Sequence, residues 1–222
     1  MRTPSGPGRR SVVAVVSLLF AFTAGTAQAL PADRAQPQAL LFATSNTAVI
    51  TDPGDPRLDT PLTEFARAVR GVIRDNGARD GRSELLDGVF WSGELQRATY
   101  ERSRSFDVRE TDPIELHHIA DLVRKEFGQE SVLTFEHLAR DSARTDAFLV
   151  EVPGVDVTDL HDGLVADPLA RERLGGGSVA MDGELVLVAE LSDLELAREF
   201  VVRLGGRWDG ANLRYGDREF VG

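Results

Sequence analysis

The feature that most constrains the fold of this chain is a helical stripe of apolar residues that occurs twice in the first half. Residues 61–76 and 113–128 each begin at a proline, end at or beside a glycine, and carry apolar residues three or four positions apart. This spacing places the apolar side chains on one face of a helix, and proline and glycine are favoured at its two ends. The sequence therefore predicts two amphipathic helices, each of which must cover another apolar surface.

Short apolar or alternating segments, typical of strands, surround these helices and continue through the second half. The expected strands are 39–44, 83–91, 97–110, 131–138, 147–152, a hairpin over 178–190, and 212–221. Further helices are expected from 158 and from 192, and the polar segment 139–145 reads as a linker.

This order of elements predicts an α+β fold of two ferredoxin-like βαββαβ halves, residues 30–139 and 146–222. Each half would be an antiparallel sheet with helices on one face. Two such sheets can cover each other, and the alternative is two separate small domains.

The first 29 residues have the pattern of a signal peptide. A basic start precedes an apolar run from Val12 to Ala24, and Ala27-Gln28-Ala29 forms a small-x-small cleavage site. We expect cleavage after Ala29 and secretion of an extracellular protein; a retained N-terminal anchor is the alternative. Arg9-Arg10 leaves both the general and the twin-arginine export routes open.

The net charge of the chain restricts the classes of partner that it can bind. The net charge is −11, and removal of the three leader arginines makes the mature chain more acidic. Nucleic acids and anionic membrane surfaces attract clustered positive charge, so we expect neither as a partner. The chain has no cysteine, which excludes disulfides and thiolate chemistry.

Residues 39–138 resemble a small family of exported bacterial proteins known only as a domain of unknown function. The resemblance is carried by "LLFATS", "DGVFW", "YERSR" and above all "FGQESVL", in this order. It covers about half of the mature chain. It implies export and an α+β fold, and it implies no activity.

The adjacent histidines His117 and His118 are the first candidates for a metal or catalytic site. Consecutive residues of a helix diverge by about 100°, whereas helical metal ligands are spaced three or four residues apart. We therefore expect a solvent-exposed pair. The acidic loop around Asp52, Asp55 and Asp59 lacks the spacing of a calcium loop and is better explained by turns. The sequence predicts no metal, no cofactor and no identifiable catalytic residue.

One strand offers a candidate binding surface. Alternation along 97–110 places Tyr100, Arg102 and Arg104 on one face, with Trp91 on the preceding strand. Guanidinium groups suit carboxylate or phosphate ligands, and aromatic rings provide an apolar wall. We predict that this face binds a small anionic ligand or an acidic peptide; the alternative is an ion-pair ladder with acidic neighbours.

The predicted function is therefore binding of a small anionic ligand or a protein partner outside the cell. A cofactor-free enzyme, with its site in the cleft between the two halves, is the first alternative. A secreted inhibitor acting through loop 45–60 is the second. An enclosed pocket with a buried histidine or carboxylate pair would favour the enzyme. The oligomeric state stays open.

Overall fold

The computed structural model describes residues 38–222, so the predicted signal peptide and its cleavage site lie outside the described residues. The strands are β1 (Ala39–Thr44), β2 (Arg79–Ser92), β3 (Arg97–Arg109), β4 (Val132–His137), β5 (Ala147–Pro153), β6 (Gly176–Ala180), β7 (Glu184–Glu190) and β8 (Asn212–Val221). The helices are α1 (Thr63–Asp75), α2 (Pro113–Phe127), α3 (Val157–Ala166), α4 (Pro168–Arg173) and α5 (Leu194–Arg203). Within this range, no helix has the length and apolar character that a membrane span requires.

The eight described strands close into one antiparallel barrel in the order β1-β3-β2-β6-β7-β5-β8-β4. The prediction of two ferredoxin-like halves with stacked sheets is therefore wrong. Instead of covering each other face to face, strands from the two halves of the chain pair edge to edge. β2 pairs with β6, and β4 pairs with β8.

The length of β2 explains its pairing with β6. We call each pairing between strands of the two halves a seam. β2 is a strand of 14 residues, and it pairs with β3 along nearly its whole length. Its stretch Leu86–Phe90 also pairs with β6 on the other side. An exposed edge strand leaves backbone N–H and C=O groups unpaired, and closure into a barrel satisfies these groups.

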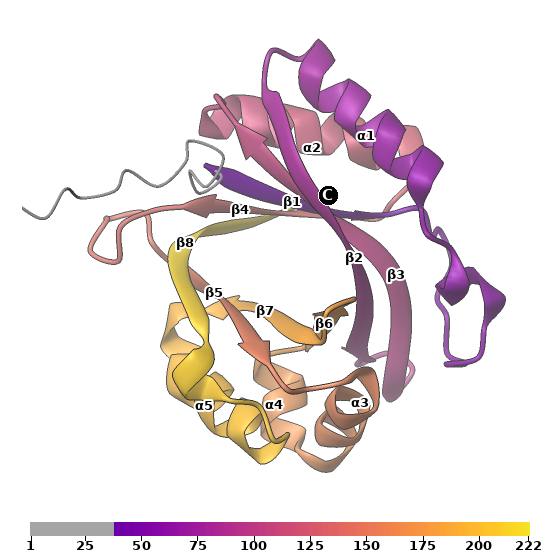
Figure 1. Ribbon diagram of the computed structural model, residues 1–222, viewed down its shortest axis with the longest axis vertical. Helices are drawn as coiled ribbons and strands as arrows, with labels where there is room; N and C mark the ends of the chain where they lie inside the picture. The colour runs from indigo at the N-terminus through magenta and orange to yellow at the C-terminus, as the bar shows by residue number, and fades with distance from the viewer. Residues whose placement is uncertain (1–37) are drawn as a thin grey trace, which may run out of the picture. The chain divides into compact units, whose positions relative to one another are not determined.

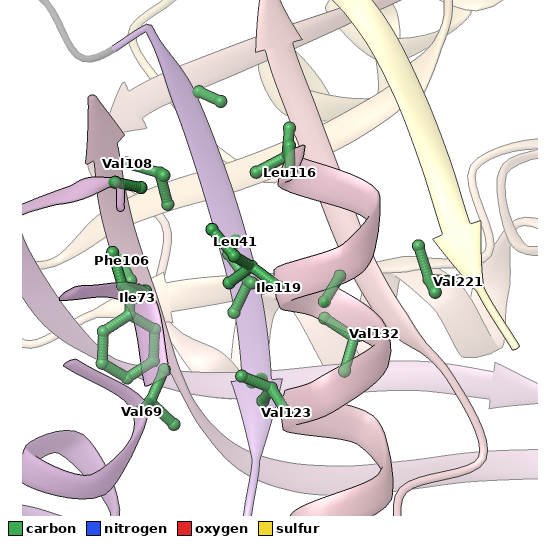
Figure 2. Close-up of a cluster of buried hydrophobic side chains, with 14 of the residues drawn as sticks. Leu41, Val69, Ile73, Phe106, Val108, Leu116, Ile119, Val123, Val132 and Val221 are labelled. Carbon is green, nitrogen blue, oxygen red and sulfur yellow. The ribbon is translucent and has the colours of Figure 1, made fainter. Parts of the chain in front are cut away.

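Helices cover the outside of the barrel in two groups, α1 with α2 and α3 to α5 (Figure 1). Under α1 and α2, the outward side chains of β1 and β3 pack against both helices; Figure 2 shows Leu41 and Phe106 among Val69, Ile119 and other apolar residues. These four side chains are fully or almost fully buried. The two apolar stripes seen in the sequence thus cover one side of the barrel.

A second outer cluster, which includes Phe148, Leu164 and Phe200, lies under α3 to α5. A third cluster forms where inward-facing side chains of several strands meet, and it includes Leu40, Leu86, Phe135 and Leu149. We call the space enclosed by the strands the lumen. The third cluster is the core of the lumen.

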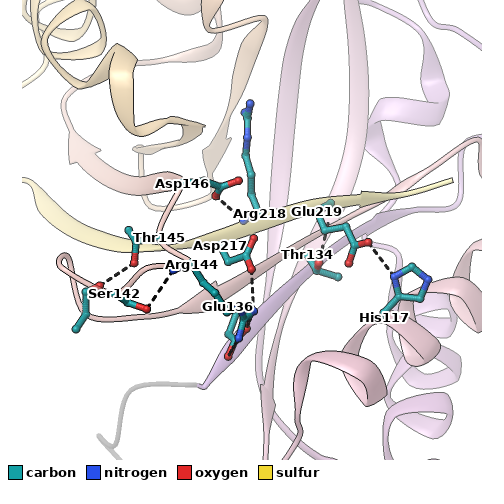
Figure 3. Close-up of polar contacts among 11 residues, drawn as sticks. His117, Thr134, Glu136, Ser142, Arg144, Thr145, Asp146, Asp217, Arg218 and Glu219 are labelled. Carbon is teal, nitrogen blue, oxygen red and sulfur yellow. Dashed lines mark hydrogen bonds and ion pairs between the residues drawn. The ribbon is translucent and has the colours of Figure 1, made fainter.

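The seam between β4 and β8 carries polar contacts on its outer side (Figure 3). The predicted linker 139–145 joins β4 to β5, and its Arg144 contacts Glu136 on β4 and Asp217 on β8, the latter at 2.7 Å. His117 of α2 contacts Glu219 of β8 at 2.9 Å. These contacts tie the linker and α2 to the strand pair that closes the barrel.

Candidate ligand site in the barrel lumen

Alternation along β3 divides its side chains between the outside of the barrel and the lumen. Phe106 and Val108 pack outward beneath the helices. The opposite face carries Glu101 and Ser103, which line a cavity. Every strand except β5 contributes to the lining of this cavity, so it lies at one end of the lumen.

The cavity has a volume of about 410 Å³ and walls that are mostly apolar. Its apolar lining includes Phe42, Phe90, Leu133, Val186, Val188 and Phe220, and its polar lining includes Glu101, Ser103, Gln129, Ser131, Ser178 and Arg218. Pockets of this size, with apolar walls and a few polar groups, are typical of small-molecule sites. We call this space the lumen cavity.

Glycine on β2 and β6 gives the two strands room to approach each other at this end. A Cβ on Gly88 of β2 would lie 3.3 Å from the hydroxyl oxygen of Ser178 on β6, which is a tight contact. A Cβ on Gly176 would collide with the carbonyl oxygen of Val89, and Gly176 has a φ of 152°. Gly176 and Gly177 thus form the start of β6.

Aromatic residues are exposed at the rim of the lumen cavity. Phe220 has 61% of its surface exposed, and Phe90 has 36%. Large apolar side chains that border a cavity and remain in contact with water favour the binding of an apolar molecule. Arg218 also lines the cavity, but its guanidinium group already pairs with Glu190 at 3.1 Å.

Glu101 is the acidic side chain in the wall of the lumen cavity. Burial raises the pKa of its carboxyl group, and the hydrogen bond from Ser103 offsets this effect only in part. In the sheet register, Glu101 lies opposite Gly88, which has no side chain. The carboxyl group therefore holds its proton to a higher pH than an ordinary glutamate.

Gln129 supplies a hydrogen-bond donor that nothing in residues 38–222 uses. Its side chain is only 6% exposed, and its Oε1 accepts a hydrogen bond from the backbone N–H of Thr44 at 3.1 Å. Its Nε2 has no partner among the described residues. A buried amide without a partner costs about 1–3 kcal/mol, so a ligand oxygen that accepted this N–H would recover part of that cost.

The end of α2 positions Gln129. Gly128 ends the helix in the left-handed conformation with a φ of 63°, and the N–H of Gln129 donates to the carbonyl oxygen of Arg124 at 2.9 Å. This termination holds the backbone of Gln129 against the helix end. The side chain is therefore held at both its backbone and its Oε1.

A second cavity of about 260 Å³ adjoins the lumen cavity beneath residues 44–50. Glu101 and Gln129 line both cavities, together with Thr44, Phe90 and Ser131. These two polar side chains therefore stand where the cavities meet.

The predicted site residues of β3, Tyr100, Arg102 and Arg104, lie on its outer face, which Phe106 and Val108 share. Trp91 borders the lumen cavity, and the guanidinium group of Arg171 lies 4.3 Å from its ring centre. Tyr100 stacks on His161 with 6.0 Å between ring centres. Each aromatic ring thus already has a partner on the outside of the barrel.

The two predicted arginines lie close to each other. Arg102 is buried, pairs with Asp87, and donates from Nε to the carbonyl oxygen of Thr60 at 3.0 Å. Burial lowers the pKa of Arg104, and the nearby charges of Arg70 and Arg102 lower it further. Binding of an anion at this face stays a prediction.

The adjacent histidines diverge on α2. Both are exposed, and His117 contacts Glu219 of β8. Among the residues that the structure describes, no three His, Asp or Glu side chains gather as a metal ion requires. Asp55, which belongs to the acidic loop considered for calcium, accepts hydrogen bonds from Arg57. These hydrogen bonds lower the pKa of the Asp55 carboxyl group to about 2.

The opposite end of the lumen is charged. Its smaller cavity, about 190 Å³, is lined among others by Arg82, Glu84, Asp107, Glu151 and Arg214. Arg82 contacts Glu84, and Arg214 contacts Glu151. The charges at this end are mostly paired within the protein, which makes the lumen cavity the better candidate for a ligand.

Sequence reasoning missed Glu101 and Gln129, although a signal for both was present. Four segments carry the family resemblance, and their residues Phe42, Phe90, Glu101 and Gln129 meet at the lumen cavity. The polar face of strand 97–110 was a second signal. The resemblance itself stays a prediction.

We found no matching family model and no matching curated protein. One solved structure, titled "Crystal structure study of anthrone oxidase-like protein", is similar with 9% sequence identity and a TM-score of 0.25. The similarity covers 86% of this chain and 95% of that chain. At this TM-score the likeness supports no conclusion about the fold or the activity of the present protein.

Proposed function

We propose that this protein binds a small, flat and mostly apolar molecule in the lumen cavity. The ligand carries a carbonyl or hydroxyl oxygen at one edge. The observation that carries the proposal is the free amide donor of Gln129 in a cavity whose walls include three phenylalanines. The sequence predicted a binding role at the outer face of β3. The present proposal assigns binding to the lumen cavity instead, and export stays a prediction.

The proposal rests on a cavity wall that is apolar on most of its surface and carries a hydrogen-bond donor at one position. Phe42, Phe90 and Phe220 offer ring faces and edges to an aromatic ligand. Removing about 150 Å² of apolar ligand surface from water contributes roughly 4 kcal/mol before the costs of association. The free amide N–H of Gln129 donates a hydrogen bond to the ligand oxygen and orients the ligand.

A cavity-filling variant tests the location of the site. Val188 lines the lumen cavity, so Val188→Trp should fill it and weaken the binding of 2-naphthol at least tenfold, measured by the fluorescence of this probe. Val202→Trp is the matched control, because Val202 lies on α5 with 55% of its surface exposed. This control should bind as the wild type does.

Circular dichroism and thermal unfolding of each variant show whether the barrel is intact. Equal binding of 2-naphthol by a folded Val188→Trp variant and by the wild type would place the site elsewhere. A wild-type protein that shows no saturable binding of the probe would contradict the proposal directly.

A further inference from the structure

We infer that Glu101 and Gln129 together catalyse proton transfer at a carbon atom next to a ligand carbonyl group, so that the bound ketone and its enol interconvert. The substrate class is a cyclic ketone that carries an aryl ring on the carbon next to the carbonyl group. This inference rests on the proposed function, because both side chains line the cavity in which the ligand would bind.

The placement of the two groups comes first. Glu101 projects from β3, and Gln129 follows the end of α2, yet both border the lumen cavity and the adjoining cavity beneath residues 44–50. Since the N–H of Thr44 occupies Oε1 of Gln129, the amide presents its Nε2 hydrogens as the free side of the group. A ligand oxygen at Nε2 would have its neighbouring carbon in the same cavity as Glu101.

Glu101 has the properties of the acid–base group. A general base works best when its pKa is close to the working pH, and a glutamate reaches this range through burial. Burial raises the pKa of Glu101, a shift in this direction. Its carboxylate takes the proton from the carbon. The resulting carboxylic acid returns a proton either to carbon, which regenerates the ketone, or to the enolate oxygen, which gives the enol.

Gln129 stabilises the charge that forms. As the C–H bond breaks, its electron pair becomes a C=C bond, and the carbonyl π pair moves to the oxygen. The amide N–H of Gln129 donates to this developing enolate oxygen, as the donors of an oxyanion hole do. Protons and electrons balance between the ketone and Glu101, so the step requires no other reactant.

The apolar walls select the class of ketone. A single amide donor stabilises an enolate only modestly, so the substrate itself must spread part of the negative charge over an aromatic ring. A ring of this kind also fits against Phe42 and Phe220. A simple aliphatic ketone offers neither advantage.

Few charged groups face Glu101 from the elements around it. Among the residues lining the two cavities that it borders, the other charged side chains are Arg218 of β8 and Glu130 of the segment after α2. Arg218 pairs with Glu190, and Glu130 is exposed to solvent. The pH dependence of proton transfer should therefore follow Glu101.

Hydrogen–deuterium exchange tests the inference. 2-Tetralone in deuterated buffer is followed by proton NMR, with and without the wild-type protein, and the protein should accelerate exchange next to the carbonyl. Glu101→Gln should lower the accelerated rate at least 100-fold. Glu126→Gln is the matched control, because Glu126 is an exposed glutamate of α2.

A second variant tests the amide. Gln129→Glu keeps an oxygen to accept from the N–H of Thr44 but removes the free amide donor, and it should slow exchange at least tenfold. Exchange by the wild type should rise with pH and level off above the pKa of Glu101, and Glu101→Gln should lack this rise. Both variants are compared with the wild type for 2-naphthol binding.

The outcomes separate the two proposals. Binding of 2-naphthol without accelerated exchange of 2-tetralone would refute proton transfer and leave the binding function in place. An exchange rate that is the same in the wild type and Glu101→Gln would do so as well. If the wild type does not bind 2-naphthol, both the binding proposal and the proton-transfer proposal are refuted. Unchanged exchange in Gln129→Glu would refute the role of the amide.

Discussion

His137 should make the stability of the barrel depend on pH. It ends β4 in a partly buried position, with its ring edge against Phe135 at 5.2 Å between ring centres. Neither of its ring nitrogens has a hydrogen-bond partner within residues 38–222. Burial, and to a smaller extent the charge of Arg214, lowers the pKa of His137 to about 4 from its ordinary value of 6.5.

The sign and the size of the effect follow from these values. Above pH 6.5 the imidazole is neutral in the folded and the unfolded chain, and its contribution to stability is fully present. Below pH 6.5 the unfolded chain binds a proton that the folded chain resists, so the contribution is lost as the pH falls through about 4. The difference corresponds to about 3 kcal/mol at most. Because the ring is partly exposed to solvent, we expect about half of this.

Urea unfolding at pH 7.5 and at pH 4.5 measures this contribution. Between these pH values, the wild type should lose about 1 kcal/mol more unfolding free energy than the His137→Phe variant, in which no imidazole titrates. His118→Phe is the control, since His118 is exposed, and it should behave as the wild type does. An identical pH dependence in His137→Phe and the wild type would refute the reasoning.

Further substitutions test the fold. Gly216→Ala would place a Cβ against a backbone carbonyl of β4, so we expect a loss of at least about 2 kcal/mol of unfolding free energy. Gly71 of α1 has open space where a Cβ would lie, so Gly71→Ala should stabilise the protein by about 0.5–1 kcal/mol. Urea unfolding of both variants measures the two changes. Arg102→Ala leaves Asp87 without its ion-pair partner and should lower the unfolding free energy by about 2 kcal/mol. A double-mutant cycle with Asp87→Asn measures the coupling between the two residues, and zero coupling would contradict the importance of this ion pair. Asp112→Ala removes the side chain that accepts a hydrogen bond from the backbone N–H of Glu115 in the first turn of α2. This loss should cost about 1 kcal/mol of unfolding free energy and so lower the midpoint of thermal unfolding. An unchanged midpoint would contradict this role of Asp112.

Local patterns predicted the helices well because the signals that start and end a helix lie within a few residues. The expected helix 113–128 is α2, Pro113–Phe127, with Asp112 as its cap and Gly128 at its end. The helix expected from Pro61 begins at Thr63 instead, because Leu62 adopts a left-handed conformation with a φ of 51°. The helix expected from 158 corresponds to α3, and a second short helix, α4, begins directly after it at Pro168.

The sequence by itself determined which side chains share a face of each element, since the period of the apolar pattern depends only on local backbone geometry. It placed Glu101 and Ser103 on the face of their strand opposite Tyr100 and Arg102. It carried no information about which edges of the strands would meet, because alternation is the same in a stacked sheet and in a closed one. Only tertiary pairing of β2 with β6 and of β4 with β8 decided that this polar face would line an enclosed lumen. The site depends on that pairing, because burial of Glu101 and Gln129 arises from strands and turns that are distant in the sequence.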